Sequence, residues 1–270
     1  MRRNEHIQLS TSGRNTRYRR AWTSVVRIAA AFGVPIALWW AVVLIARPQS
    51  FILPGPDRVA HAFVTFGGDL LWNSAVTTYE MLIGLAAGCV FGIAVALLMA
   101  AVPALGRAAM PVIVVTQSLP VFAIAPLLVL WFGFGLASKI VMATTVIFFP
   151  VTASFHDGLT RTDAGLLDLA DLYHASRWQR LTLIQLPAAM PGLVSGLRMA
   201  ATVAPIGAIV GEWVGASSGL GLVMIHANAR LMTDLMFAAL AILITIALIL
   251  RLAVDWLTRD LVHWNPEFDR

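Results

Sequence analysis

The sequence contains few charged residues. Only 12% of its 270 residues are Asp, Glu, Lys or Arg, while 59% are hydrophobic, and the formal net charge is +5. A soluble globular domain carries about 25% charged and about 45–50% apolar residues. The composition therefore excludes an ordinary soluble domain. The mean hydropathy of +0.80 comes from long uncharged blocks, which are typical of membrane spans.

Cysteine and lysine are almost absent as well. Cys89 is the only cysteine, which excludes an intrachain disulfide framework and a multi-cysteine metal site. Lys139 is the only lysine and follows Ser138, so the chain lacks the phosphate-binding pattern G-x-x-x-x-G-K-[ST]. The chain therefore cannot itself be a P-loop ATPase.

The six histidines offer no catalytic or metal-binding pattern. They form no i, i+4 pair and no H-E-x-x-H motif, and no cysteine or acidic residue lies near them at ligand spacing. We therefore predict that this chain has no catalytic residue, no metal site and no cofactor of its own. The arginines near the N-terminus are attributed to membrane topology and anionic lipid, and no nucleic-acid partner is predicted.

The uncharged blocks predict an all-α membrane protein with six transmembrane helices. Each span needs roughly 20 apolar residues. Residues 1–22 form a polar basic tail, and residues 23–270 form the transmembrane domain, in which the first block stays as an anchor. The predicted spans are Ile28–Ala46, Met81–Gly106, Ala108–Ser138, Ile140–Phe155, about Gly192–Val214, and Leu235–Leu250.

The third block is too long for one straight helix. It contains Pro111, Pro120 and Pro126, and each proline removes a backbone donor and disfavours helix at the preceding residue. We expect a helix, a break near Ser118 to Pro120, and a short returning or tilted piece. Such broken backbone at membrane depth must be shielded from lipid.

The basic residues predict the orientation. Six spans place both termini on one side, and that side receives fifteen of the 19 basic residues. Lys and Arg are enriched on the cytoplasmic side of short loops, so we predict that both termini are cytoplasmic. The largest internal cytoplasmic loop then covers residues 156–191. The other side receives Arg47, Arg58, Lys139 and Arg230.

This loop carries helical signals of its own. Leu166, Leu169, Ala170 and Tyr173 stand at i, i+3, i+4 and i+7 and predict one apolar stripe. Asp163 is suited to cap the start of this helix. A second short helix is expected after Ser176 and should end before Pro187. An amphipathic helix here could face lipid or dock another protein.

The spacing in the loop resembles a family motif. Asp168-Leu169-Ala170, three residues, His174, nine residues, and then Ile184-Gln185-Leu186-Pro187 resemble the EAA loop of ABC importer permeases. That motif reads Glu-Ala-Ala, three residues, Gly, nine residues, Ile, any residue, Leu-Pro. The resemblance extends over about Ser50 to Pro266 and points to the nitrate/sulfonate/taurine permease family. Its further segments are TQSLPVFAIAPLLVLWFGFG (Thr116–Gly135), LPAAMPGLVSGLRMA (Leu186–Ala200), GEWVGASSGLG (Gly211–Gly221) and the terminal HWNP.

The resemblance implies a type I ABC importer permease fold in the cell inner membrane. It also implies two permease copies in a homodimer, two ABC ATPase subunits that hold ATP and Mg, and an extracytoplasmic solute-binding protein. The loop helix would seat in a cleft of the ATPase. The residues expected to couple to the ATPase are Asp168, Leu169, Ala170, Tyr173, His174, Ala175, Arg177, Ile184, Leu186 and Pro187.

The loop departs from the motif in three places. Asp168 stands for the glutamate, Leu169 for the first alanine and His174 for the glycine. By resemblance, that glycine ends the loop helix in a left-handed conformation, where a non-glycine residue costs about 1–2 kcal/mol and histidine is among the more tolerant types. We therefore expect somewhat altered coupling.

Two regions are candidates for the translocation path. Broken backbone near Ser118 would expose polar groups, although a helix kink satisfied by its neighbours is the alternative. Arg198 could reach the cytoplasmic interface or act as a gate or inter-subunit contact, and Glu212 could be a structural hydrogen-bond acceptor or lie at the outer mouth. The candidate path residues are Thr116, Gln117, Ser118, Pro120, Arg198, Met199, Thr202 and Glu212; Met199 and Thr202 rest on resemblance alone.

The leading hypothesis is therefore the permease subunit of an ATP-driven ABC importer for a small polar solute, with ATP hydrolysed on a separate subunit. The alternatives are an ion-coupled secondary transporter and a non-transporting membrane scaffold. The candidate solutes are nitrate, taurine or alkanesulfonates, and the pyrimidine precursor of thiamine. By resemblance, QSLPVFAIAPLLVLWFGFG and IVGEW favour the pyrimidine branch.

Overall fold

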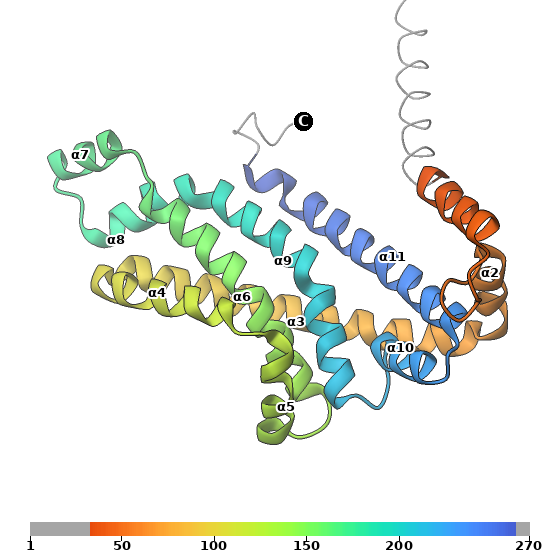
Figure 1. Ribbon diagram of the computed structural model, residues 1–270. Coiled ribbons are helices and arrows are strands. Elements are labelled where there is room, and N and C mark those ends of the chain that lie inside the picture. Colours follow the sequence, from red (N-terminus) through yellow and green to blue (C-terminus); the bar gives the residue numbers. More distant parts are fainter. Residues whose placement is uncertain (1–32, 263–270) are drawn as a thin grey trace, which may run out of the picture.

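The computed structural model describes residues 33–262, and in this part of the chain every regular element is a helix (Figure 1). A helix over Gly33–Ala46 comes first. The others are α2 (Pro56–Thr65), α3 (Gly67–Ala101), α4 (Pro103–Ser118), α5 (Val121–Phe132), α6 (Leu136–Thr160), α7 (Ala164–Leu172), α8 (Arg177–Arg180), the π-helical η1 (Leu181–Gln185), α9 (Leu186–Gly215), α10 (Leu220–Ala229), α11 (Thr233–Thr258) and the 3-10 helix η2 (Arg259–Val262).

The all-α membrane class is confirmed, but the described residues do not reach the predicted count of six spans. Four helices are long and apolar enough to cross a membrane, and the bent pair α4–α5 makes up to five. The helix over Gly33–Ala46 is shorter, and its predicted start at Ile28 lies outside the described residues. The predicted tail, residues 1–22, also lies outside them. The spanning helices are Gly67–Ala101, Leu136–Thr160, Arg177–Gly215 and Thr233–Val262.

The predicted break in the third block is confirmed. α4 ends at Ser118, α5 begins at Val121, and the two helices are bent by 99°. Leu119 has extended backbone angles (φ −75°, ψ 129°), as expected for a residue before proline. Pro120 follows as the N-cap of α5.

The predicted bounds of the second span are wrong. The prediction began at Met81 because Glu80 ends the uncharged block, but α3 starts at Gly67 and carries Glu80 in its interior. The predicted end at Gly106 fails because Pro103 opens α4, and proline is well suited to the first turn of a new helix. The short helices α2 and α10 were not predicted, because each has only 10 residues and span length was the criterion.

Glycines bring α3 into close contact with α6. Gly84 and Gly88 are four residues apart, so they lie on one face of α3. A Cβ atom built on Gly84 would lie 2.4 Å from the Cβ of Ala143, and one built on Gly88 would lie 2.5 Å from a methyl group of Ile147. Small residues at this spacing allow two membrane helices to approach closely. The contact therefore depends on the absence of these side chains.

α9 packs on α6 in the same way. A Cβ atom on Gly192 would lie 2.6 Å from the carbonyl oxygen of Ser154, and one on Gly207 would lie 2.8 Å from the Cα of Ala143. α6 is thus held between α3 and α9 at backbone distance, and these three helices form the centre of the fold.

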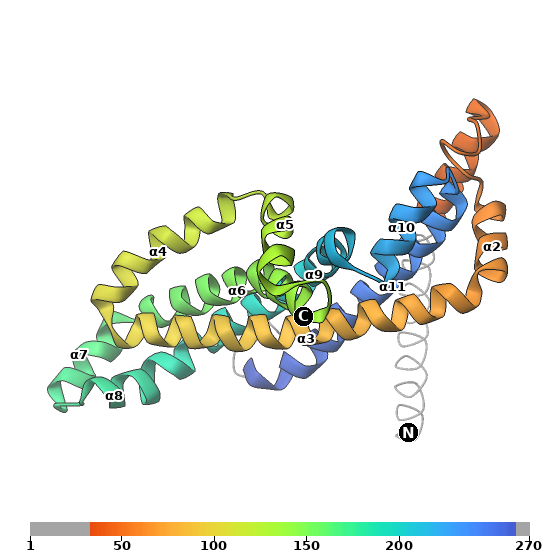
Figure 2. The same cartoon turned by 90° about the horizontal axis from the view of Figure 1, so that it is seen from below.

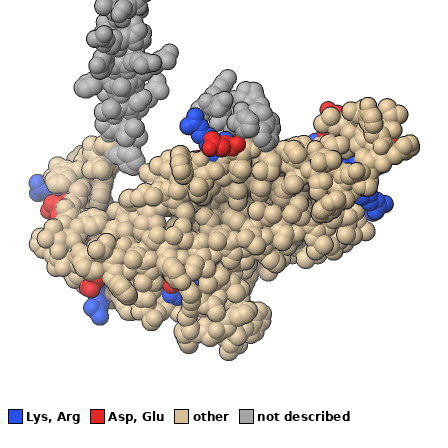
Figure 3. Space-filling model, turned by 180° about the vertical axis from the view of Figure 1, so that it is seen from behind, with Lys and Arg blue, Asp and Glu red and all other residues tan. Residues whose placement is uncertain are grey.

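The loop that contains α7 and α8 lies at one end of α6 and α9, and α2 and α10 lie at the far side of the molecule (Figures 1 and 2). α3 has 35 residues, about 52 Å at 1.5 Å per residue, and it runs between these two regions. Figure 3 shows a face on which few Lys, Arg, Asp or Glu side chains are visible and other residues make up most of the surface. Few charged side chains are expected where a protein is embedded in a membrane.

Candidate functional site

Each of the two short helices in the loop between α6 and α9 starts at a predicted residue. The Asp163 side chain accepts a hydrogen bond from the Gly165 N–H at 2.7 Å. Ser176 opens α8 with a capping box, in which it accepts from the Gln179 N–H at 3.3 Å and the Gln179 side chain accepts from the Ser176 N–H at 2.8 Å. Both predictions are confirmed, because short polar side chains satisfy the free N–H groups of a helix start.

His174 occupies the left-handed position predicted for the motif glycine. Its φ is +52°. The His174 N–H donates to the Asp171 carbonyl at 3.0 Å and the Ala175 N–H donates to the Ala170 carbonyl at 2.9 Å. These two bonds form a Schellman motif at the end of α7. The chain therefore makes the turn of the motif with a histidine in place of glycine.

Replacing His174 with glycine should stabilise this turn. Glycine adopts φ +52° without the steric cost of a side chain, so we expect a gain of about 1 kcal/mol in the local opening free energy. Slower hydrogen exchange at the Ala175 amide would show it. His174→Val is the matched opposite, since a β-branched residue is an outlier at positive φ. Equal exchange in both variants would contradict the prediction.

Arg180, the last residue of α8, stabilises the turn at His174. Its Nε donates to the Ala175 carbonyl at 3.2 Å, and its guanidinium forms an ion pair with Asp171 on α7. Neither residue of this ion pair was among the predicted site residues. Their spacing of nine positions carries no helical signal, so only the fold of the loop brings them together.

The predicted apolar stripe of α7 does not pack onto the chain. Ala170 is buried at 4% exposure, but Leu169 is 50% exposed and Tyr173 is 77% exposed. Asp168 is also exposed. We call the exposed apolar residues of this loop the loop patch; they are Leu166, Leu169, Leu172, Tyr173 and Trp178.

The prediction that the second loop helix ends before Pro187 is wrong. One helical segment runs from Arg177 to Gly215, and it passes Pro187 by way of η1, where the Leu186 N–H bonds to the Leu181 carbonyl five residues back. Pro187 has no N–H to donate to the carbonyl four residues back. A π turn does not require that bond, because its hydrogen bonds join residues that are five apart. The predicted loop 156–191 therefore shrinks, since His156 also lies inside α6.

The remaining coupling candidates lie along this junction. Ala175 is half-buried in the turn, and Arg177 is exposed at the start of α8. Ile184 and Leu186 are half-buried in η1 and at the start of α9, and Pro187 is exposed. These residues lie where the loop joins the long helix, and the loop patch lies beyond them.

The break between α4 and α5 leaves polar groups accessible. Gln117, Ser118 and Pro120 are exposed, whereas Thr116 is half-buried and its hydroxyl donates to the Ile113 carbonyl at 2.6 Å. The Thr116 hydroxyl is therefore already hydrogen-bonded within α4. Gln117 and Ser118 are free to line a cavity.

Four path candidates lie on α9, and they do not share one environment. Met199 is 60% exposed and Thr202 is exposed. Arg198 turns towards α11, where its Nε lies 2.8 Å from Asp255 Oδ1 and Arg251 pairs with the same carboxylate. Arg198 thus joins α9 to α11 through an ion pair. Its predicted place at the cytoplasmic interface, or its role as a gate or inter-subunit contact, stays a prediction.

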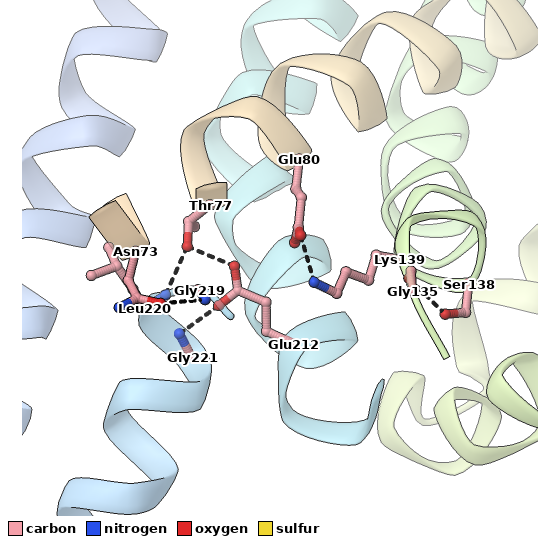
Figure 4. A network of polar contacts seen from close by, with 10 residues as sticks. All are labelled: Asn73, Thr77, Glu80, Gly135, Ser138, Lys139, Glu212, Gly219, Leu220 and Gly221. Atoms are coloured by element: carbon pink, nitrogen blue, oxygen red, sulfur yellow. Dashed lines mark hydrogen bonds and ion pairs between the residues drawn. The ribbon is translucent and has the colours of Figure 1, made fainter. Parts of the chain in front are cut away.

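Glu212 is buried in a network at the other end of α9 (Figure 4). It is 1% exposed. Its Oε1 accepts from the Thr77 hydroxyl at 2.6 Å, and its Oε2 accepts from the Gly221 N–H at 2.5 Å. Of the two roles left open for Glu212, this geometry supports the structural acceptor, and the place at the outer mouth of the path stays a prediction.

The same network holds the link between α9 and α10. The Gly219 N–H donates to Asn73 Oδ1 at 2.7 Å, and the Leu220 N–H donates to Thr77 Oγ1 at 2.8 Å. Gly219 has φ +122°, and a Cβ atom there would lie 2.3 Å from the Glu212 carboxylate. Only glycine fits this position. α3, α9 and α10 are thus joined by buried hydrogen bonds.

A buried ion pair lies beside this network and was missed by the sequence analysis. Lys139 Nζ on α6 lies 2.5 Å from Glu80 Oε1 on α3, and the two residues are 5% and 4% exposed. Lys139 lies close to Gly211 of α9. A Cβ atom built on Gly211 would lie 3.3 Å from the Lys139 Cα. The sequence signal that could have revealed this ion pair is the single lysine between apolar residues, because a charge inside a membrane span needs a partner.

The comparisons with known proteins decide the family. The family model for binding-protein-dependent transport system inner membrane components matches residues 88–263. The chain belongs to this family. It is therefore the permease subunit of an ABC importer, an inner-membrane component, and this membership decides against the secondary transporter and the scaffold.

Individual relatives agree with this assignment. The permease is 49% identical over 234 residues to a probable ABC transporter permease of Haemophilus influenzae, with 86% of this chain and 95% of the relative covered. It is 35% identical to the riboflavin transport permease RibX of Chloroflexus aurantiacus and 32% identical to the formylaminopyrimidine transport permease ThiX of Halalkalibacterium halodurans. Each of these two matches covers 87% of this chain, with 91% and 95% of the relatives.

A solved structure confirms the fold of the permease. A chain from inward-facing conformations of the MetNI methionine ABC transporter superposes with a TM-score of 0.59 at 20% identity, covering 73% of this chain and 98% of that chain. The type I importer architecture expected from the resemblance is thus found in the structure.

The permease carries two separate groups of candidate residues. The coupling candidates gather in the loop at one end of α6 and α9 (Figure 1), and the buried network of Glu212 with the Glu80–Lys139 pair lies near their other ends (Figure 4). Long unbroken helices join the two ends. These helices can therefore transmit a displacement of the loop to the opposite end.

Proposed function

We propose that this permease works as a homodimer, with α9 and the break before α5 at its translocation path and with α7 docked on an ABC ATPase. The observation that carries this proposal is the loop patch. α7 places Leu169 and Tyr173 outward, at 50% and 77% exposure, on a turn held by its own hydrogen bonds. An ordered apolar patch of this kind is typical of a protein contact.

The helix that follows the loop supplies the mechanical connection. Arg177–Gly215 spans 39 residues without interruption, about 58 Å at 1.5 Å per residue. α6 enters the loop from the other side and lies at backbone distance from α9 through Gly192 and Gly207. Movement of the docked α7 would therefore displace α6 and α9 together, as alternating access between the two sides requires.

ATP and Mg belong to the partner in this proposal. The sequence lacks the phosphate-binding loop, so two ATPase subunits, one for each α7, would bind and hydrolyse ATP. An extracytoplasmic binding protein would deliver the solute. The excess of arginine on the loop side supports the orientation with both termini in the cytoplasm.

Leu169→Arg tests the docking of α7. The side chain is half exposed, so a charge there leaves the turn intact, but it would be buried without a partner in an ATPase cleft. We expect loss of ATPase co-purification and a drop of at least about tenfold in ATP-driven uptake in proteoliposomes.

The matched control for this experiment is Arg161→Gln at the end of α6. Arg161 forms an exposed i, i+4 ion pair with Asp157, and such pairs contribute little. This variant should retain ATPase binding and uptake. Ala170→Arg is unsuitable as a docking test, because Ala170 is buried in the chain itself. Full uptake by Leu169→Arg, or uptake by the wild type without the ATPase, would refute the proposed function.

We propose a solute with a flat pyrimidine-type ring. The relatives at 35% and 32% identity are named for riboflavin and formylaminopyrimidine, and both solutes contain such a ring. A relative named for taurine is 31% identical, so taurine is the comparison solute. The ligand that raises the melting temperature of the cognate binding protein identifies the solute class, because a ligand that binds only the folded state stabilises it.

A further inference from the structure

α9 exposes one stripe along its length. Met199, Thr202, Ile206 and Trp213 follow one another at spacings of three, four and seven residues, which places them on one helix face. Met199, Ile206 and Trp213 are 60%, 52% and 41% exposed, and Thr202 is exposed as well. The stripe runs from the middle of α9, at Met199, to the level of the Glu212 network.

Trp213 stands on a rigid backbone. Its neighbour Glu212 points into the protein, where it bonds to Thr77 and to the Gly221 N–H, while the indole of Trp213 points outward and keeps 41% exposure. Adjacent helix residues differ in direction by about 100°. The buried network therefore fixes the position of the exposed ring.

Phe122 from α5 joins Trp213 at this end of the stripe. The two ring centroids are 5.7 Å apart and the ring planes are tilted by 37°. Phe122 keeps 54% exposure, so the pair does not bury itself. The two rings contact each other, and both keep area that a further ring can contact.

The polar residues around this face argue against lipid as its occupant. Phe122 comes directly after the α4–α5 break, where Gln117 and Ser118 are exposed. The Thr202 hydroxyl on the stripe is already paired, because it donates to the Arg198 carbonyl at 3.0 Å. Lipid-exposed irregular backbone and unpaired polar groups are costly at membrane depth. An aqueous path that carries a solute satisfies these groups.

We propose that Phe122 and Trp213 are specificity-determining residues that contact the flat ring of the transported solute. The inference rests on the proposed function and extends it by naming the residues that discriminate an aromatic from an aliphatic solute. Aromatic side chains favour flat heterocycles, because ring stacking tolerates different ring substituents but requires a ring. An aliphatic solute such as taurine would gain little from this pair.

The test uses the permease with its ATPase and binding protein in proteoliposomes and measures ATP-driven uptake of radiolabelled formylaminopyrimidine. The double variant Phe122→Leu/Trp213→Leu keeps apolar volume but removes both rings. Uptake should fall about tenfold, and Trp213→Phe should retain most of it. The matched control is Trp131→Leu on α5, where the indole is 68% exposed and outside the pair; its uptake should equal that of the wild type.

A second readout separates ring contact from assembly. Equilibrium binding of formylaminopyrimidine to the permease–ATPase complex without binding protein should weaken in the double variant, while complex mass and ATPase binding stay the same. Unchanged uptake would overturn the inference in favour of a lipid-facing aromatic pair, and dissociation of the permease copies would overturn it in favour of packing. Wild-type uptake of taurine without uptake of formylaminopyrimidine would also overturn it, while the importer function would stand. Uptake independent of the ATPase would refute the proposed function itself.

Discussion

Lys139→Met is expected to destabilise the permease strongly. The substitution leaves the Glu80 carboxylate at 4% exposure without the ammonium group that lies 2.5 Å away. Removing one partner of a buried ion pair costs about 3–5 kcal/mol, because the remaining charge is buried without compensation. The measurement is the melting temperature and yield of the detergent-extracted protein.

The double variant Glu80→Leu/Lys139→Met provides the control. Replacing both members of a buried pair by hydrophobic residues of similar volume is often close to neutral, so the double variant should recover most of the lost stability. If it is no more stable than Lys139→Met, the loss comes from packing of the lysine stem across Gly211, and the ion pair is not its cause.

Glu212→Ala is expected to release the connection between α9 and α10. The Thr77 hydroxyl and the Gly221 N–H would each lose an acceptor, and a buried unsatisfied group costs about 1–3 kcal/mol. We expect a lower melting temperature, faster proteolysis between Gly215 and Leu220, and reduced uptake.

Two further variants test the geometry of this network. Glu212→Gln keeps an acceptor for one of the two donors and should lose about half as much stability as Glu212→Ala. Asn73→Ala removes only the acceptor of the Gly219 N–H and should affect proteolysis of the same segment. Unchanged proteolysis in Glu212→Ala would show that the carboxylate does not hold this connection.

Local rules predicted several elements correctly. The break at Leu119 and Pro120, the Asp163 cap and the helix start after Ser176 all depend on residues within a few positions of one another. Backbone donors, caps and steric limits act at this range, so the sequence carries the information directly. The left-handed conformation at His174 was expected from the family resemblance.

One failed prediction has a local cause: Pro187 does not end its helix, because a π turn lets the chain continue into α9. The other contacts that were not predicted lie across the fold. α3 carries Glu80 in its interior, where that charge pairs with Lys139. Arg198 meets Asp255, 57 positions further along the chain. Neither periodicity nor spacing encodes pairs at such separations.

The sequence by itself determined the membrane class, the family motif of the loop, the absence of an ATP-binding loop and the turns that local backbone chemistry dictates. The tertiary structure alone decided which charged residues are buried together, which face of α9 stays open, and that Glu212 is a structural acceptor. The physical reason is that burial and pairing in a helical bundle depend on close helix contacts such as those of Gly84 and Gly207 with Ala143, and these contacts exist only after the helices have packed.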